Sequence, residues 1–215
     1  MRQALEELFV QWGMPIAIRV DNGMPLGDPQ RKSIPELALW LLCKDIEVIF
    51  NRPRLPTDNA KVERMQRTTK NWAEVTQAKD IDDLAARLEQ AIIIQREKLK
   101  VRRLGRRTRL QAYPSLVSNN RLYSPDYFCV EKAYKRLEGW TMVRKVSSHG
   151  QISLYGVQHH IGKQHKGAYV SIKLHSQSLQ WIVYDGNNNL IAQCQASNLS
   201  ADNIKNLSVG QRTYD

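Results

Sequence analysis

The first part of the chain alternates between helical and extended apolar patterns. Apolar residues recur at helical spacing over residues 2–12, and Gly13 with Pro15 ends that predicted helix. The run IAIRV predicts a strand that closes on Asp21-Asn22-Gly23. The segment SIPELALWLLCKD predicts a second helix, with Ser33 as its cap, and EVIFNR predicts a second strand.

Two further helices are expected before the pattern changes. One begins near Asp58 or Asn59 and continues through KVERMQRTTKNWAEVTQA. The next covers IDDLAARLEQAIIIQREKLKVRRL, with Asp80 and Asp83 at capping positions. The order of helices and strands up to residue 77 is typical of an α/β fold.

The last third of the chain has the pattern of short strands. We expect strands in WTMVRKV, QISLYGVQHHI, AYVSIKL, LQWIVYD and NLIAQCQ, separated by turn residues, and hence a small antiparallel β-barrel. The sequence therefore predicts an α/β core over residues 1–77, a helical, basic and linking segment over 78–138, the barrel over 139–200 and a tail over 201–215.

Charge changes this picture more than composition does. Apolar residues make up 42% of the chain and charged residues 25%, as in ordinary globular proteins, but the net charge is +11 and the pI about 9.7. Such an excess favours a polyanionic partner, most often nucleic acid. Three widely spaced cysteines and an N-terminus without a signal-peptide pattern lead us to expect a cytoplasmic protein with no membrane partner.

Two acidic residues stand at the ends of predicted elements. Asp21 ends the first strand, and Glu63 lies one turn into the third helix. Taken alone, Asp21 is typical of a turn, because Asp-Asn and Asn-Gly pairs favour turn geometry. Two carboxylates from separate elements that converged at one sheet edge would instead suit Mg²⁺ or Mn²⁺ in phosphoryl transfer.

The order of short motifs favours the second interpretation. WGMPIAIRVDNGMP, followed by LALWLLCKDIEVIFNRPRLPTDNAKVERMQRTTK, resembles the second half of the catalytic core of DDE transposases and retroviral-type integrases, closest to bacterial insertion-sequence transposases. The matching residues are Trp12, Gly13, Pro15, Asp21, Asn22, Gly23, Trp40, Leu41, Arg52, Pro53, Pro56, Asn59, Glu63, Arg64 and Lys70. The resemblance implies an RNase H-like fold, DNA integration and recombination by a mobile element, and Asp21 and Glu63 as catalytic metal ligands. It also implies a bacterial-type protein that is nucleoid-associated when bound to DNA. The last strands resemble, more weakly, the small barrel that follows such cores.

Two departures from the family pattern matter. Ala60 replaces the usual glycine before the third helix, and no Asp precedes Asp21, although the family's first acid lies upstream on the first strand. We therefore expect a truncated chain that is inactive alone and that self-associates or pairs with a full-length transposase, because a partial sheet exposes a strand edge.

Candidate DNA contacts lie on the third helix and in a run of cations. Glu63, Arg67 and Lys70 share one helix face. Eight Lys or Arg residues with a single acid occupy residues 96–109, either as the exposed end of a helix or as a sequence-independent phosphate contact. We predict DNA contacts at Arg67, Lys70, Arg102, Arg103, Arg106 and Arg107.

Alternatives to strand transfer remain open. A non-catalytic DNA-binding or assembly module derived from a transposase would keep the basic run and the barrel. A general RNA-binding protein is less favoured, because the strands offer no evident cluster of exposed aromatic residues for base stacking. The histidines, including His159 and His160, are expected at the surface and in turns, and Trp72, Trp140 and Trp181 in cores.

Overall fold

The structure is a computed structural model of the 215-residue chain, and it describes residues 1–28, 32–52, 54–116 and 120–206. Pro53, one of the motif residues, lies outside these ranges. The chain forms two compact units. The sheet unit contains residues 1–5, 16–50 and the chain from 124 onward, and the helical unit contains residues 6–15 and 51–123.

The sheet unit begins with a parallel strand pair that confirms the predicted α/β character. Strand β1 (Ala17–Val20) pairs in parallel with β2 (Glu47–Phe50), with Ala17 opposite Glu47 and Val20 opposite Phe50. Helix α2 (Glu36–Cys43) connects them. This β-α-β connection directs the carboxyl ends of both strands to the same edge of the sheet.

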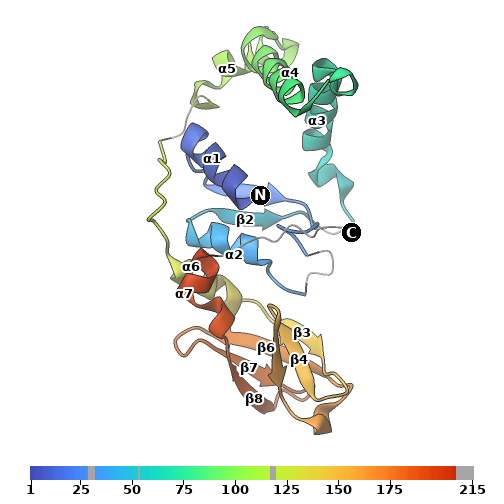
Figure 1. Ribbon diagram of the computed structural model, residues 1–215, viewed down its shortest axis with the longest axis vertical. Helices are drawn as coiled ribbons and strands as arrows, with labels where there is room; N and C mark the ends of the chain where they lie inside the picture. The colour runs from blue at the N-terminus through green and yellow to red at the C-terminus, as the bar shows by residue number, and fades with distance from the viewer. Residues whose placement is uncertain (29–31, 53, 117–119, 207–215) are drawn as a thin grey trace. The chain divides into compact units, whose positions relative to one another are not determined.

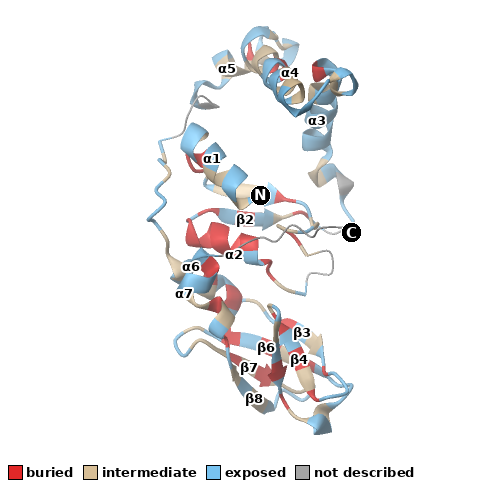
Figure 2. Cartoon of the chain, in the orientation of Figure 1, coloured by how far each residue is buried: buried red, intermediate tan, exposed pale blue. Residues whose placement is uncertain are grey.

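Helix α2 is buried on all sides, as a helix that is apolar around its whole circumference must be. Every residue from Leu37 to Cys43 is buried. It packs against β2 and also against helices α6 (Val130–Glu138) and α7 (Ala201–Lys205), so it lies between layers (Figures 1 and 2). The helix begins at Glu36, after Pro35. The prediction that Ser33 caps this helix is wrong, because no side chain caps it. The Ser33 backbone N–H and hydroxyl donate to Asp28 instead.

The C-terminal strands form an antiparallel sheet, but one of the predicted strands is in fact two. Its order is β3-β6-β7-β8, and among the described residues no pairing closes this sheet into a barrel. The predicted strand QISLYGVQHHI is a separate hairpin of two strands. Tyr155 and Gly156 both have positive φ, which makes the two-residue turn that splits it. The bounds are β3 (Met142–Lys145), β4 (Gln151–Leu154), β5 (Val157–His160), β6 (Tyr169–His175), β7 (Gln180–Tyr184) and β8 (Leu190–Gln195).

The helical unit is built on helices α3 (Ala60–Ala73) and α4 (Ile81–Ile93), which pack side by side (Figure 1). Helix α3 begins at Ala60, within two residues of the expected start, and Asp80 caps α4 by accepting the backbone N–H of Asp83, as predicted. The α-helical part of α4 ends at Ile93, well before the expected end, and continues as one π-helical turn, Ile94–Lys98. The helices in or entering this unit are α1 (Arg2–Trp12), α3 (Ala60–Ala73), α4 (Ile81–Ile93) and α5 (Arg109–Ala112).

Short 3₁₀ turns complete the connections in both units. They are Pro56–Asp58, Val75–Gln77, Arg102–Leu104, Pro114–Leu116, Lys163–His165 and Ser197–Leu199. Across the described ranges, no helix is long and apolar enough to span a membrane.

The tryptophans and histidines divide between core and surface. Trp181 is fully buried, and its ring stacks on Tyr155 with centroids 5.9 Å apart. Trp72, which we expected in a core, is 42% exposed, because α3 buries little apart from Ala73. The expectation that His159 lies at the surface is also wrong: its side chain faces inward from β5 and is only 8% exposed.

Candidate functional site

Asp21 lies at the carboxyl end of β1 and helps to fold the turn that follows. Its carboxylate Oδ1 accepts the backbone N–H of Gly23 at 3.0 Å. The turn closes further through the Gly27 N–H, which donates to the Gly23 carbonyl at 2.7 Å. A side chain at Gly27 would lie 2.5 Å from the Asp21 carbonyl oxygen, so the loop is folded tightly against its own backbone. The interpretation of Asp21 as a turn residue is therefore correct as far as Oδ1 is concerned.

The turn does not use the whole carboxylate. Asp21 is exposed, and its Oδ2 has no hydrogen-bond partner among the residues that the structure describes. A carboxylate has lone pairs on both oxygens, so one oxygen can hold the turn while the other binds a cation. The arrangement thus permits both interpretations of Asp21 at once.

Glu63 lies in the first turn of α3 with its side chain exposed. Within the described part of the chain its carboxylate has no ion pair or hydrogen bond, even with Arg67 one turn further on. A free acid near a helix N-terminus is favoured by the helix dipole, and it remains available as a ligand.

The start of α3 is held by polar contacts from the preceding segment. The Asn51 amide donates to the Asn59 side-chain oxygen at 2.9 Å. Arg52 forms a two-pronged pair with Asp58, whose side chain is only 6% exposed. Ala60 is the first residue of the helix. These contacts fix the helix start without the glycine that the family pattern has.

Asp21 and Glu63 belong to different compact units, the sheet unit and the helical unit. Among the described residues, no group of three or more His, Cys, Asp or Glu side chains forms a metal cluster. The two carboxylates have the chemistry that hard divalent cations prefer, since both offer unengaged oxygens and neither is accompanied by thiol or imidazole ligands. The chain itself thus offers two ligands suited to Mg²⁺ or Mn²⁺.

Lys70 lies at a groove in the helical unit. The groove has a volume of about 610 Å³ and lies between α3 and α4. Its apolar lining includes Met65, Leu88 and Ile92, and its cations are Lys70, Arg96 and Arg109. Of these three cations, only Lys70 was predicted individually as a DNA contact, while Arg96 and Arg109 are the ends of the predicted basic run. Their meeting at one groove was not predicted, because it depends on how the helices pack.

Contacts within the helical unit hold two of these cations: hydrogen bonds hold Arg109, and a cation–π contact holds Arg96. The Arg109 guanidinium donates to the Gln95 carbonyl at 2.6 Å, and the Gln95 amide donates to the Thr69 hydroxyl at 3.0 Å. The Arg96 guanidinium lies 4.3 Å from the centre of the Trp12 ring. Arg96 and Arg109 are therefore held in position, whereas Lys70 is exposed and reaches solvent. Arg67 is also exposed on α3 but does not line the groove.

The other four candidate DNA contacts lie on a closed turn, which we call the basic turn (Val101–Arg107). The Val101 N–H donates to the Arg107 carbonyl at 2.9 Å, and the Arg106 N–H donates to the Val101 carbonyl at 3.1 Å. Gly105 and Arg106 both have positive φ, which reverses the chain. The basic turn exposes four arginines, Arg102, Arg103, Arg106 and Arg107. The alternative of an exposed helix end is wrong for these residues.

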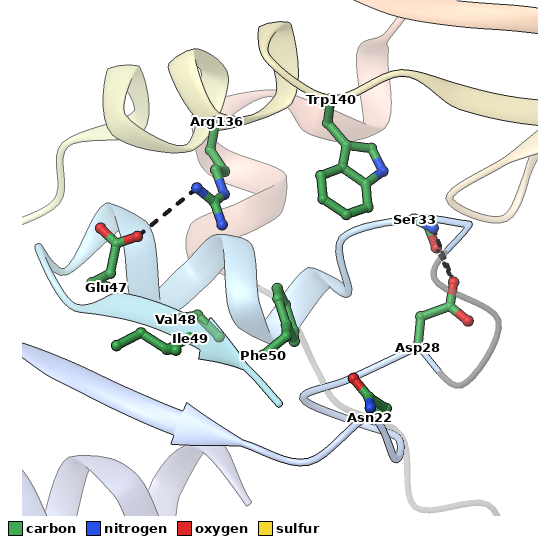
Figure 3. A pocket seen from close by; sticks show the side chains of 9 residues that line it. All are labelled: Asn22, Asp28, Ser33, Glu47, Val48, Ile49, Phe50, Arg136 and Trp140. Carbon is green, nitrogen blue, oxygen red and sulfur yellow. Dashed lines mark hydrogen bonds and ion pairs between the residues drawn. The ribbon is translucent and has the colours of Figure 1, made fainter. Parts of the chain in front are cut away.

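A second cavity lies in the sheet unit beside the turn that holds Asp21 (Figure 3). It has a volume of about 290 Å³ and lies between β2 and the end of α6. Phe50 and Trp140 supply apolar walls, Arg136 pairs loosely with Glu47 at 3.9 Å, and Asn22 lies at the far end. Sequence reasoning did not predict this cavity, since its walls come from segments about ninety residues apart along the chain.

No protein-family model matches the chain. The resemblance to transposases therefore remains a prediction from the ordered motif residues.

Proposed function

We propose that the chain is a transposase- or integrase-type protein of DNA strand transfer that works with Mg²⁺ or Mn²⁺. In this proposal, β1, α2, β2 and α3 are the second half of an RNase H-like core, and β3 to β8 are the counterpart of the small domain that follows such cores. The supporting observation is the position of Asp21, at the carboxyl end of a strand in a parallel β-α-β unit. That position is the usual one for ligand-binding side chains in parallel sheets.

Asp21 and Glu63 would hold the metal ions. Bound metal would activate the attacking water or DNA 3′-hydroxyl and stabilise the leaving oxygen of the phosphodiester. The chain's own contribution is to supply two carboxylates with unengaged oxygens and to bind the DNA backbone through Arg67 and Lys70. Both cations follow Glu63 on the exposed surface of α3, so they would bring phosphates close to that ligand.

A third acid has to come from outside the part of the chain that these motifs cover. The β1–β2 pair has no third strand among the described residues, so each of its two strands keeps one edge without a strand partner. We therefore propose that an edge of this pair binds another chain, either a second copy or a full-length transposase. Size-exclusion chromatography with light scattering at micromolar concentration would give a dimer or larger species, and a sharp monomer would contradict self-association.

The alternative is a DNA-binding or assembly module without catalysis. The observation that favours it is the basic turn, whose four arginines are exposed on one preformed loop. Contacts of this kind bind the phosphate backbone without regard to sequence.

A nicking and strand-transfer assay on supercoiled plasmid with Mn²⁺ tests the main proposal. Glu63→Gln removes the charge at the proposed ligand, and Glu97→Gln is the matched control, an exposed glutamate in the same helical unit. We expect activity that Glu63→Gln abolishes and Glu97→Gln preserves. Equal activity in both variants would contradict the proposal, and salt-sensitive DNA retention without any nicking would support the module instead.

A further inference from the structure

The four-stranded sheet has one covered face and one open face. Side chains alternate between them along each strand, so that Ile172, Leu174, Trp181 and Val183 are buried. The Tyr155 ring stacks on Trp181, so the β4–β5 hairpin covers this buried face. The opposite face is the open face. Its members, all exposed or half-buried, are Val143, Lys145, Tyr169, Ser171, Lys173, His175, Gln180, Ile182, Tyr184, Leu190, Gln193 and Gln195.

Two tyrosines are neighbours on the open face. Ser171 lies directly opposite Tyr184 across β6 and β7, and Tyr169 is two residues before Ser171. Tyr169 and Tyr184 are therefore diagonal neighbours, a spacing of roughly 7–8 Å that aromatic side chains can bridge. Tyr169 is 65% exposed, so most of its ring is open to a ligand. Strand register thus brings together two aromatic residues that are far apart in sequence, of which Tyr169 is exposed and Tyr184 is half-buried.

The charge of the open face has one sign. Lys145 and Lys173 lie on it, and the Lys145 ammonium is 6.0 Å from the centre of the Tyr169 ring. Strands β3, β6, β7 and β8 contain no Asp or Glu. The sequence has no acid at all from residue 139 to residue 184. A polyanion would therefore meet no repulsive carboxylate on these strands.

We propose that this open face binds single-stranded nucleic acid, with Tyr169 and Tyr184 stacking on successive bases and Lys145 and Lys173 contacting phosphates. Every base has a π-face, so such stacking tolerates any sequence. In a duplex the bases are already stacked on one another, so the face prefers single strands. A four-stranded sheet of this size has room for about two or three bases.

The chemistry of the open face fits this ligand better than a protein partner. Ser171 and Lys173 on β6 separate its apolar member Val143 on β3 from Ile182 on β7 and Leu190 on β8. A protein interface core is depleted of charge and continuous in its apolar area. Gln180 and Gln193 add amide groups that can donate to or accept from base edges.

The test is fluorescence anisotropy with the full chain and labelled oligothymidylate of about 15 nucleotides, within the range of known single-strand site sizes. EDTA in the buffer removes any contribution of the Asp21–Glu63 metal site, so the result is separate from the proposed catalysis. We expect the natural chain to bind this single strand, and a duplex of equal length, which the basic turn can bind, serves as the comparison. Tyr169→Ala and Tyr184→Ala should each weaken binding about tenfold.

Tyr169→Phe and Tyr184→Phe are the matched controls, because they keep the ring and lose only the hydroxyl. Both should bind within about twofold of the natural chain if stacking is the interaction. If Tyr184→Ala fails to fold by circular dichroism, the exposed Tyr169→Ala decides the question. Unchanged single-strand affinity in Tyr169→Ala, or an equal loss of single-strand and duplex affinity in that variant, would overturn the proposal.

Discussion

The carboxylate of Asp21 accepts the backbone N–H of Gly23 at 3.0 Å, which makes one residue both the end of a strand and the clamp of the following turn. The same side chain keeps a second oxygen exposed. Its structural and its proposed chemical roles therefore depend on different properties, since the turn needs an oxygen acceptor and a metal ion needs the negative charge.

Substitutions at Asp21 should separate these two roles. Asp21→Asn keeps an oxygen that can accept from Gly23, and we expect its free energy of unfolding to stay within about 0.5 kcal/mol of the natural chain. Asp21→Ala removes the acceptor and should cost about 1 kcal/mol. Urea unfolding followed by circular dichroism measures both. Equal stability of the two variants would mean that the hydrogen bond does not hold the turn.

The loop after β1 should tolerate no side chain at Gly27. Gly27→Ala would bring a methyl group 2.5 Å from the Asn22 carbonyl carbon, so the loop must open. We expect a loss of about 1–3 kcal/mol in the free energy of unfolding, as in other overpacked sites. Gly186→Ala is the control, because a Cβ there meets no atom within 4 Å. Similar urea midpoints for the two variants would contradict the packing of this loop.

Local patterns predicted much of this fold. Helix α2, the strands β1 and β2, and the Asp80 cap of α4 all depend on residues close in sequence. The hairpin turn at Tyr155 was missed because Tyr-Gly is not one of the usual turn pairs, although both residues adopt positive φ. The basic turn was missed because its closure depends on one pairing, between Val101 and Arg107.

The candidate sites also differ in how far the sequence could predict them. Asp21 and Glu63 could be selected from sequence because the motif order marks them. The convergence of Lys70 with Arg96 and Arg109 follows from the packing of α3 on α4. The pairing of Tyr169 with Tyr184 follows from strand register. Neither relationship is encoded by spacing along the chain.

The basic turn should contribute to duplex binding through its arginines. Arg102→Gln and Arg103→Gln together should weaken DNA retention and reduce the slope of log affinity against log salt by about 0.9 for each phosphate that is no longer neutralised. Filter binding across a salt series measures this slope. Lys79→Gln is the control, an exposed cation of the same unit outside the basic turn. An unchanged slope in the double variant would exclude the basic turn from the interface.

Stability should fall in mild acid because of His159. Burial lowers the pKa of His159 below its ordinary value of 6.5, since the charged imidazolium is poorly solvated there. The unfolded chain then binds a proton that the folded chain does not, so the folded state loses stability as the pH falls below about 6.5. Urea unfolding at pH 7 and pH 5 measures how much the free energy of unfolding falls between them. This fall should be smaller in His159→Gln than in the natural chain. His160→Gln, next to it and exposed, should keep the full difference, and a full difference in both would contradict this assignment.

A metal site shared by Asp21 and Glu63 is tested most directly by Mn²⁺ binding in electron paramagnetic resonance, with the full chain and duplex DNA present. We predict that Asp21→Asn and Glu63→Gln each weaken Mn²⁺ binding about tenfold or more, the effect of removing one charged ligand. Because both residues would hold the same site, the double variant should lose less than the product of the two single effects. Asp126→Asn and Glu97→Gln, exposed acids outside the site, should bind as the natural chain does. Unchanged binding in the Asp21 and Glu63 variants, or fully independent losses, would contradict a metal site shared by these two residues.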